Sequence, residues 1–338
     1  MFTKSNLLLL LAVLALMTAA CQPIMPEDGG DADGPALTAV EIMLDWVPNT
    51  NHTGLYVALE KGFYEAAGLD VTIIQPGETY AEQAVGIGSV PFGISFQESV
   101  TFARAEGVPI VSIAAVIQHN TSGFASRTEA GIETPADFVG RTYGSFGSPI
   151  EAPMIDLLMS CTGEDISVDD VTFIDTGYAE FLSITERDVD FVWIFYGWDG
   201  VNAQMKEVDI NVIMLNEWLD CVPDYYTPVI ITNETMISEN PEVVSAFMGA
   251  TAEGFDYAIA NPEESAGILL AATPESDPAL IEASQIWLSA NYQDDAAQWG
   301  IQSEDVWQGY ADWLLENGVL TDEFDGAAAF TNEFLPAE

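Results

Sequence analysis

Short apolar runs alternate with amphipathic stretches from residue 40 onward. In the first part of the chain this pattern predicts strands over 40–44, 69–74, 91–95 and 109–117, and helices over 53–67, 80–86 and 97–106. Strands that alternate with helices of this size are typical of right-handed βαβ units and a parallel sheet.

The alternation restarts after a polar stretch. It predicts helices over 134–139, 150–159, 178–187 and 201–207, and strands over 141–144, 171–174, 189–195, 210–215 and 228–232. Beyond residue 233 the chain is almost wholly helical, with helices over 241–261, 262–272, 278–290 and 303–317. Most of these helices begin at a proline or a small polar residue.

Two α/β blocks followed by a helical tail indicate two similar lobes, with the tail packed on the first. We expect lobe 1 to comprise residues 39–117 plus 233–335 and lobe 2 to comprise residues 118–232. The strands 109–117 and 228–232 are candidates for the crossings between the lobes. Small ligands bind in such clefts, at the carboxyl ends of the strands.

The first residues have the pattern of a secretory signal. Lys4 precedes an apolar run over 7–17, which is too short to span a bilayer, and small residues follow directly before Cys21. In bacterial lipoproteins a cysteine at this point is lipidated, with palmitate as one acyl group. We therefore expect a signal peptide over 1–20 and an acidic lipidated tether over 21–38, which anchors the protein to the extracytoplasmic face of the cell membrane. Ordinary secretion with a coincidental cysteine is the alternative.

Charge excludes several classes of partner. The chain has 7 Lys plus Arg against 54 Asp plus Glu, a net charge of −47. Nucleic acid and anionic lipid repel such a surface, so we expect no nucleic-acid partner and membrane contact through the lipid anchor alone. The acidic residues themselves are explained by solubility or by adaptation to salt.

Metal and cofactor chemistry have no support in the sequence. His52 and His119 are the only histidines, and metal-ligand spacings are absent, so we expect no metal and no cofactor. Besides Cys21 the chain has Cys161 and Cys221. An exported protein can pair two such cysteines, but two buried thiols fit the sequence equally well.

Several loops after strands combine aromatic and polar side chains. They are residues 45–52, 96–98, 118–122, 145–151, 195–199 and 224–226. Trp and Tyr offer flat faces to a ring, while Gln, Asn, Ser and Glu bind its edge. Because these loops carry neither Lys nor Arg, they favour a neutral or weakly cationic heterocycle over a phosphate.

Each of these residues also has an ordinary structural role. An isolated Trp is more often a core residue than a ligand contact, and an acid at a helix start complements the helix dipole. An enzyme is less well supported, because the chain lacks a Gly-x-Ser-x-Gly elbow and a paired cysteine and histidine. A secreted enzyme that uses Glu98 or Glu151 as general base stays open as an alternative.

The segment Leu44–Tyr56, with sequence LDWVPNTNHTGLY, resembles the opening motif of the NMT1/THI5-like periplasmic binding proteins. Further matches are KGFY at 61–64, GLDV at 68–71, FGIS at 92–95, GSPIE at 147–151, DFVW at 190–193 and DYYTP at 224–228. The resemblance extends from about residue 40 to about residue 320. It implies a type II periplasmic-binding-protein fold, in which two doubly wound lobes enclose a ligand cleft.

The resemblance also implies a function. Such proteins bind a small heterocyclic ligand and deliver it to the permease and ATPase of an ABC importer. The expected ligand is a thiamine-precursor pyrimidine, either hydroxymethylpyrimidine or formyl-aminopyrimidine, and riboflavin is the alternative. The fungal synthase branch carries a cysteine cluster, which the stretch around Cys221 lacks. The residues expected to line the cleft are Trp46, Asn51, His52, Gln97, Glu98, Ser148, Glu151, Tyr196, Trp198 and Tyr226.

Overall fold

The computed structural model describes residues 36–77, 79–177 and 179–337. The expected signal peptide and the lipidation site Cys21 lie outside these residues. The described end of the expected tether is already part of the folded protein, because Thr38 is the first residue of a strand and its N–H donates to the carbonyl of Gly68 (2.9 Å).

The first sheet has five strands in the order β2-β1-β3-β10-β4. Their bounds are β1 Thr38–Met43, β2 Leu69–Ile74, β3 Phe92–Ser95, β4 Ile110–Ala115 and β10 Val229–Asn233. Strand β1 is parallel to β2 and β3, whereas β10 is antiparallel to β3 and β4. Residues 229–232 were expected in the second lobe, and the structure pairs them with the first sheet.

The second sheet repeats this arrangement in the order β7-β6-β8-β5-β9. Its strands are β5 Ser122–Arg127, β6 Thr142–Ser145, β7 Thr172–Asp175, β8 Phe191–Phe195 and β9 Ile210–Met214. Strand β6 is parallel to β7 and β8, and β5 is antiparallel to β8 and β9.

The prediction of a parallel sheet was therefore wrong for one strand in each lobe, because β10 and β5 are antiparallel to their neighbours. Strand β5 follows β4 of the first sheet along the chain, and β10 follows β9 of the second sheet. Each of these strands arrives from the other sheet without a βαβ crossover, which is the connection that makes neighbouring strands parallel. The pattern of the sequence did not predict β5, because its residues SGFASR mix small, polar and aromatic side chains.

The helices follow the predicted positions with few exceptions. Their bounds are α2 Thr53–Glu60, α3 Phe63–Ala66, α4 Ala81–Gly86, α5 Gln97–Ala105, α6 Glu151–Ser160, α7 Phe181–Ile184, α8 Val201–Met205, α9 Glu234–Glu239, α10 Pro241–Ala260, α11 Pro262–Ala272, α12 Pro278–Ser289 and α13 Glu304–Glu316. The helix predicted over 53–67 is split, because Gly62 adopts a left-handed conformation (φ 74°) between α2 and α3. Short 3₁₀ helices occupy Thr50–His52 (η1) and Pro135–Phe138 (η3).

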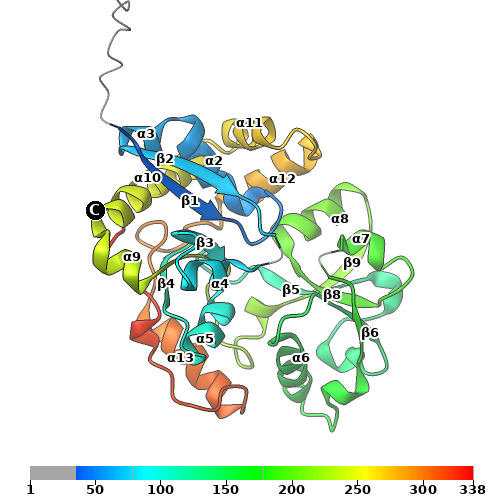
Figure 1. Cartoon of the computed structure of the whole chain (residues 1–338). Helices are drawn as coiled ribbons and strands as arrows, with labels where there is room; N and C mark the ends of the chain where they lie inside the picture. Colours follow the sequence, from blue (N-terminus) through cyan, green and yellow to red (C-terminus); the bar gives the residue numbers. More distant parts are fainter. Residues whose placement is uncertain (1–35, 78, 178, 338) are drawn as a thin grey trace, which may run out of the picture. The chain divides into compact units, whose positions relative to one another are not determined.

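The C-terminal helices α10 and α11 pack on α2, which follows β1 (Figure 1). This is the packing of the helical tail on the first lobe that the sequence predicted. The first sheet is covered on both faces. In β10, Ile230 belongs to a core cluster with Phe247 of α10, while its neighbours Val229 and Ile231 belong to a cluster with Val100 of α5. In the second sheet Phe124 and Ala125 likewise belong to different clusters. Adjacent side chains on a strand point to opposite faces, so both sheets are doubly wound.

Helix α13 joins the two halves of this fold. Trp307 packs with residues of the first sheet, whereas Tyr310 and Leu314 pack in the core of the second. The indole N–H of Trp313 donates to the carbonyl of Cys221 (2.7 Å). Cys221 is disulfide-bonded to Cys161 at the end of α6, with 5.9 Å between their Cα atoms. None of the helices in the described part of the chain is long and apolar enough to cross a membrane.

Candidate functional site

The loop after β1 positions a carboxylate through a buried histidine. His52 is fully buried, and its Nδ1 accepts a hydrogen bond from the N–H of Asn49 (3.2 Å). The proton of the neutral ring is therefore on Nε2, which donates to Asp45 Oδ1 (2.6 Å). Asn51 donates its N–H to Asn49 Oδ1 (2.9 Å), so this loop is held by its own side chains. His52 orients Asp45, and Asp45 is the group of the pair that lies nearer the surface.

Gln97, the first residue of α5, is hydrogen-bonded to Tyr226, which lies in the crossing from β9 to β10. The Gln97 amide oxygen accepts from the N–H of Tyr226 (2.8 Å), and its Nε2 donates to the carbonyl of Val306 (3.3 Å). The Tyr226 hydroxyl accepts from the N–H of Ser303 at the start of α13 (2.9 Å). Both side chains are buried, and these contacts fix the first turn of α5 against the returning chain.

The end of β3 lies near one buried carboxyl, Glu98, and a half-buried one, Glu82. Glu98 lies in the first turn of α5 and is 7% exposed, and its Oε2 has no hydrogen-bond partner among the described residues. Burial, together with a smaller contribution from the negative charge of Glu82, raises the pKa of Glu98 to about 8. Burial also raises the pKa of Glu82, which accepts a hydrogen bond from Ser95 and is influenced by the charge of Asp45. The charge of Glu82 in α4 thus acts on Glu98 in α5, and the charge of Asp45 in the loop after β1 acts on Glu82.

The Glu151 carboxylate accepts hydrogen bonds from the segment that precedes it, residues 143–148. Its carboxylate accepts from the N–H groups of Phe146 (3.1 Å), Gly147 (2.8 Å) and Ser148 (2.6 Å). The hydroxyls of Tyr143 (2.8 Å) and Ser145 (3.1 Å) donate to it as well. With five donors on one buried carboxylate, Glu151 shapes the 145–150 loop and thereby presents Ser148, which is half-buried.

The strand β8 ends in a π-helix, η5, over Tyr196–Gly200. Tyr196 packs against Trp287 of α12, with 5.5 Å between ring centroids. Trp198 packs beside the cluster formed by α11 and α12, and its indole N–H is buried without a partner among the described residues. Asp199 follows, and burial raises its pKa to about 7, with the charge of Glu180 as the second cause. Single-turn π-helices are frequent at functional sites.

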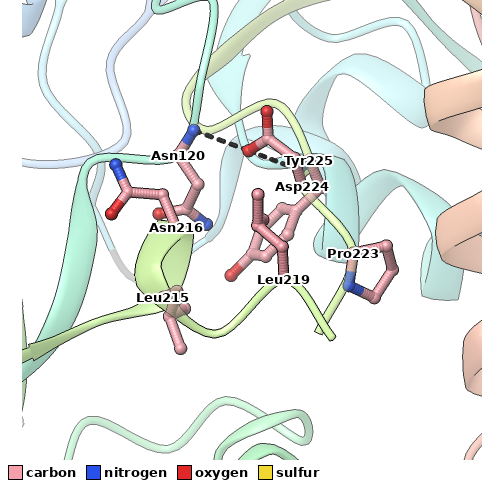
Figure 2. A pocket seen from close by; sticks show the side chains of 7 residues that line it. All are labelled: Asn120, Leu215, Asn216, Leu219, Pro223, Asp224 and Tyr225. Carbon is pink, nitrogen blue, oxygen red and sulfur yellow. Dashed lines mark hydrogen bonds between the residues drawn. The ribbon is translucent and has the colours of Figure 1, made fainter. Parts of the chain in front are cut away.

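The crossing segments between the sheets meet at a closely packed depression lined by Asn120, Leu215, Asn216, Leu219, Pro223, Asp224 and Tyr225 (Figure 2). Asp224 Oδ1 accepts from the N–H groups of Asn120 and Tyr225, both at 3.0 Å, which are the dashed lines in Figure 2. Asp224 Oδ2 contacts His119 Nδ1 (2.5 Å), and His119 Nε2 contacts Asp295 (3.0 Å). Burial alone would lower the pKa of His119, but the hydrogen bonds and charges of Asp224 and Asp295 outweigh it and raise this pKa, which favours the charged ring that donates from both nitrogens. His119 thus ties both crossings to the loop after α12.

The expected site residues therefore fall into three groups. His52, Gln97, Glu151 and Tyr226 hold loops through internal hydrogen bonds. Tyr196 and Trp198 pack on α12 and its neighbours. Trp46 and Ser148 lie in the loops after β1 and β6 and are half-buried, whereas Asn51 lies in η1 and Glu98 lies in the first turn of α5.

The expected set omitted three carboxyls that the structure brings to these loop ends: Asp45, Glu82 and Asp199. Asp45 and Asp199 stand beside chosen aromatics in the sequence, so the loop pattern could have found them. Glu82 could not have been found, because an acid in the first turn of a helix is commonplace. No group of three potential metal ligands occurs among the residues described.

The chain is similar in sequence to several known proteins. The family model described as "NMT1/THI5 like" matches residues 49–265. The chain is 32% identical to the formylaminopyrimidine-binding protein of Halalkalibacterium halodurans, over 93% of this chain and 96% of that protein. It is 25% identical to the riboflavin-binding protein RibY of Chloroflexus aurantiacus, over 98% of both chains. A relative in Legionella pneumophila, also 25% identical and covering 88% of this chain and 92% of its own length, is named 4-amino-5-hydroxymethyl-2-methylpyrimidine phosphate synthase.

Solved structures show the same fold. The alkanesulfonate-binding protein SsuA from Xanthomonas axonopodis pv. citri superposes with a TM-score of 0.65 at 16% identity, over 89% of this chain and 99% of that one. The mixed strand order of both sheets fits this likeness, and the predicted type II binding-protein fold is confirmed. By its sequence and its fold, the chain is a member of the NMT1/THI5-like family.

Proposed function

We propose that this protein binds a thiamine-precursor pyrimidine outside the cytoplasm and delivers it to an ABC importer. Family membership supports a small-molecule receptor, and a relative that carries the name formylaminopyrimidine-binding protein supports the pyrimidine. The observation that carries the proposal is the buried Glu98 carboxyl, whose Oε2 is without a partner among the described residues.

The chemistry of that carboxyl matches an aminopyrimidine. Because the pKa of Glu98 is about 8, the group keeps its proton at neutral pH. A neutral carboxylic acid offers one donor and one acceptor side by side. An aminopyrimidine presents the complementary pair, a ring nitrogen that accepts and an exocyclic amine that donates. The nearby carboxyls of Asp45 and Glu82 favour a ligand that donates hydrogen bonds and disfavour an anion.

The remaining cleft residues would supply the faces and edges of the site. In this proposal the half-buried Trp46 stacks on the ring, and Asn51 and Ser148 contact its edge. Lys61, Arg104 and Arg127 form ion pairs with surface acids. The loops that carry the expected site residues contain neither Lys nor Arg. A phosphate group would thus meet carboxyls without a counter-charge, which supports a free pyrimidine over its phosphate.

Binding without chemistry is part of the proposal. The protein and an excess of formyl-aminopyrimidine are incubated, the protein is then denatured, and the released ligand is analysed by mass spectrometry. We expect one unaltered molecule per chain. A product that accumulates beyond one equivalent would instead identify an enzyme, with Glu98 or Glu151 as the candidate base.

We also propose that Cys21 carries the lipid that holds the receptor at the membrane. The proposal is supported by the apolar run and the small residues that precede Cys21. Radiolabelled palmitate should be incorporated into the wild-type chain and not into Cys21→Ala. Equal labelling of both proteins would contradict the anchor.

A further inference from the structure

Two of the loops described above are joined by a chain of buried hydroxyls. Thr50 lies in the segment 45–52 after β1, which we call the Asp45 loop. Ser284 lies on α12, and Gly197 lies in the π-helix after β8. Ser284 Oγ bonds the carbonyl oxygen of Gly197 and lies 2.5 Å from Thr50 Oγ1. Thr50 and Ser284 are fully buried, so water does not compete for these bonds.

The direction in which these hydrogen bonds donate follows from the chemistry of the groups. A carbonyl oxygen only accepts, so the single proton of Ser284 points to Gly197. Ser284 Oγ must then accept the proton of Thr50. The resulting order is Thr50 O–H to Ser284 O–H to Gly197 carbonyl, and each bond polarises the next.

The π-helix also approaches α12 closely enough to require glycine. A Cβ added at Gly197 would lie 2.9 Å from ring atoms of Trp287 and 3.0 Å from Leu288. The Tyr196 ring contacts Trp287 on the same face of α12, and Trp198 packs beside the α11–α12 cluster. The π-helix that follows β8 of the second sheet therefore packs directly on α12. Helix α12 in turn packs with α10 and α11.

We propose that Ser284 is a positioning residue that couples the Asp45 loop to the π-helix, so that both loops order over the ligand together. The identity of the ligand in this inference rests on the proposed function. The hydrogen bonds between the two loops do not depend on it. Ser284 contributes to affinity through the two loops that it connects, without contacting the ligand. Its loss weakens the closed arrangement and accelerates ligand release.

The test uses Ser284→Ala, with Ser289→Ala as the matched control. Ser289 lies on the same helix, is half-buried, and donates its hydroxyl to the carbonyl of Ile286 within that helix (2.8 Å). In stopped-flow measurements with formyl-aminopyrimidine, we expect Ser284→Ala to dissociate roughly tenfold faster, since it leaves a buried carbonyl unpaired. Ser289→Ala should match the wild type. Equal dissociation rates for all three proteins would overturn the inference.

A second variant tests the contact without any ligand. Gly197→Ala places a methyl group against Trp287, and small-angle scattering of the ligand-free protein should show a larger radius of gyration than the wild type. A profile identical to the wild type would also overturn the inference. If the wild type does not bind the pyrimidine while Gly197→Ala still expands, the ligand assignment fails and the coupling stands. Circular dichroism checks that each variant is folded.

Discussion

At the scale of single residues, the most informative group is Glu98. The Glu98 carboxyl has a pKa of about 8 in the native protein, whereas in the unfolded chain it releases its proton near the ordinary glutamate value of 4.5. Between these values the native state binds more protons than the unfolded state, so this group makes stability fall as pH rises. The cause is burial, which penalises the charged carboxylate.

We therefore expect Glu98→Gln to be more stable than the wild type at pH 8, by at least about 1 kcal/mol, and nearly equal to it below pH 5. Urea unfolding across this pH range measures the difference. Glu239→Gln, at an exposed position, serves as control and should follow the wild type. A Glu98→Gln variant with an unchanged pH dependence would show that Glu98 ionises normally.

At the scale of elements, the 145–150 loop depends on one carboxylate. Glu151→Gln keeps a single acceptor oxygen where three backbone N–H groups and two hydroxyls now donate. We expect a loss of about 1–3 kcal/mol in the free energy of unfolding, together with weaker ligand binding through the displaced Ser148. The exposed Glu164→Gln is the control for urea unfolding. Stability equal to that of the control would mean that the loop holds itself without Glu151.

The elements also show how far the sequence could lead. Among the described residues, the alternation of apolar runs predicted nine of the ten strands, because buried strands such as β4 and β10 begin with or consist of apolar runs. It missed β5, whose small residues include Gly123, where a Cβ would lie 2.5 Å from the carbonyl of Ile213. Close approach of neighbouring strands, rather than hydrophobicity, determines that segment.

The site was predicted less completely than the fold. The loops that carry polar and aromatic residues were recognised, but a sequence cannot show which polar groups bond each other. Glu98 and Glu151 look alike in the sequence, each in the first turn of a helix. In the structure one keeps an oxygen without a partner among the described residues and the other accepts five hydrogen bonds. That difference depends on long-range packing and on the conformation of one loop.

At the scale of the whole molecule, charge repulsion opposes folding. The chain carries 54 acidic residues against 7 basic ones, and the basic residues that pair do so at exposed acids. The Debye length falls from about 30 Å at about 0.01 M salt to about 3 Å at about 1 M. We expect the melting temperature to rise steadily over this range of NaCl, and equally in KCl, because screening relieves the repulsion. A melting temperature that is flat or falls with salt would contradict this account.

The central claim is that this family member binds a pyrimidine. The most direct measurement is calorimetric titration of the compact unit Leu37–Glu338 with formyl-aminopyrimidine, hydroxymethylpyrimidine, thiamine and riboflavin. We expect one of the two pyrimidines to bind with micromolar or tighter affinity at a stoichiometry of one, and riboflavin to bind weakly or not at all. Tight binding of riboflavin alone, or heats of dilution from all four compounds, would contradict the claim.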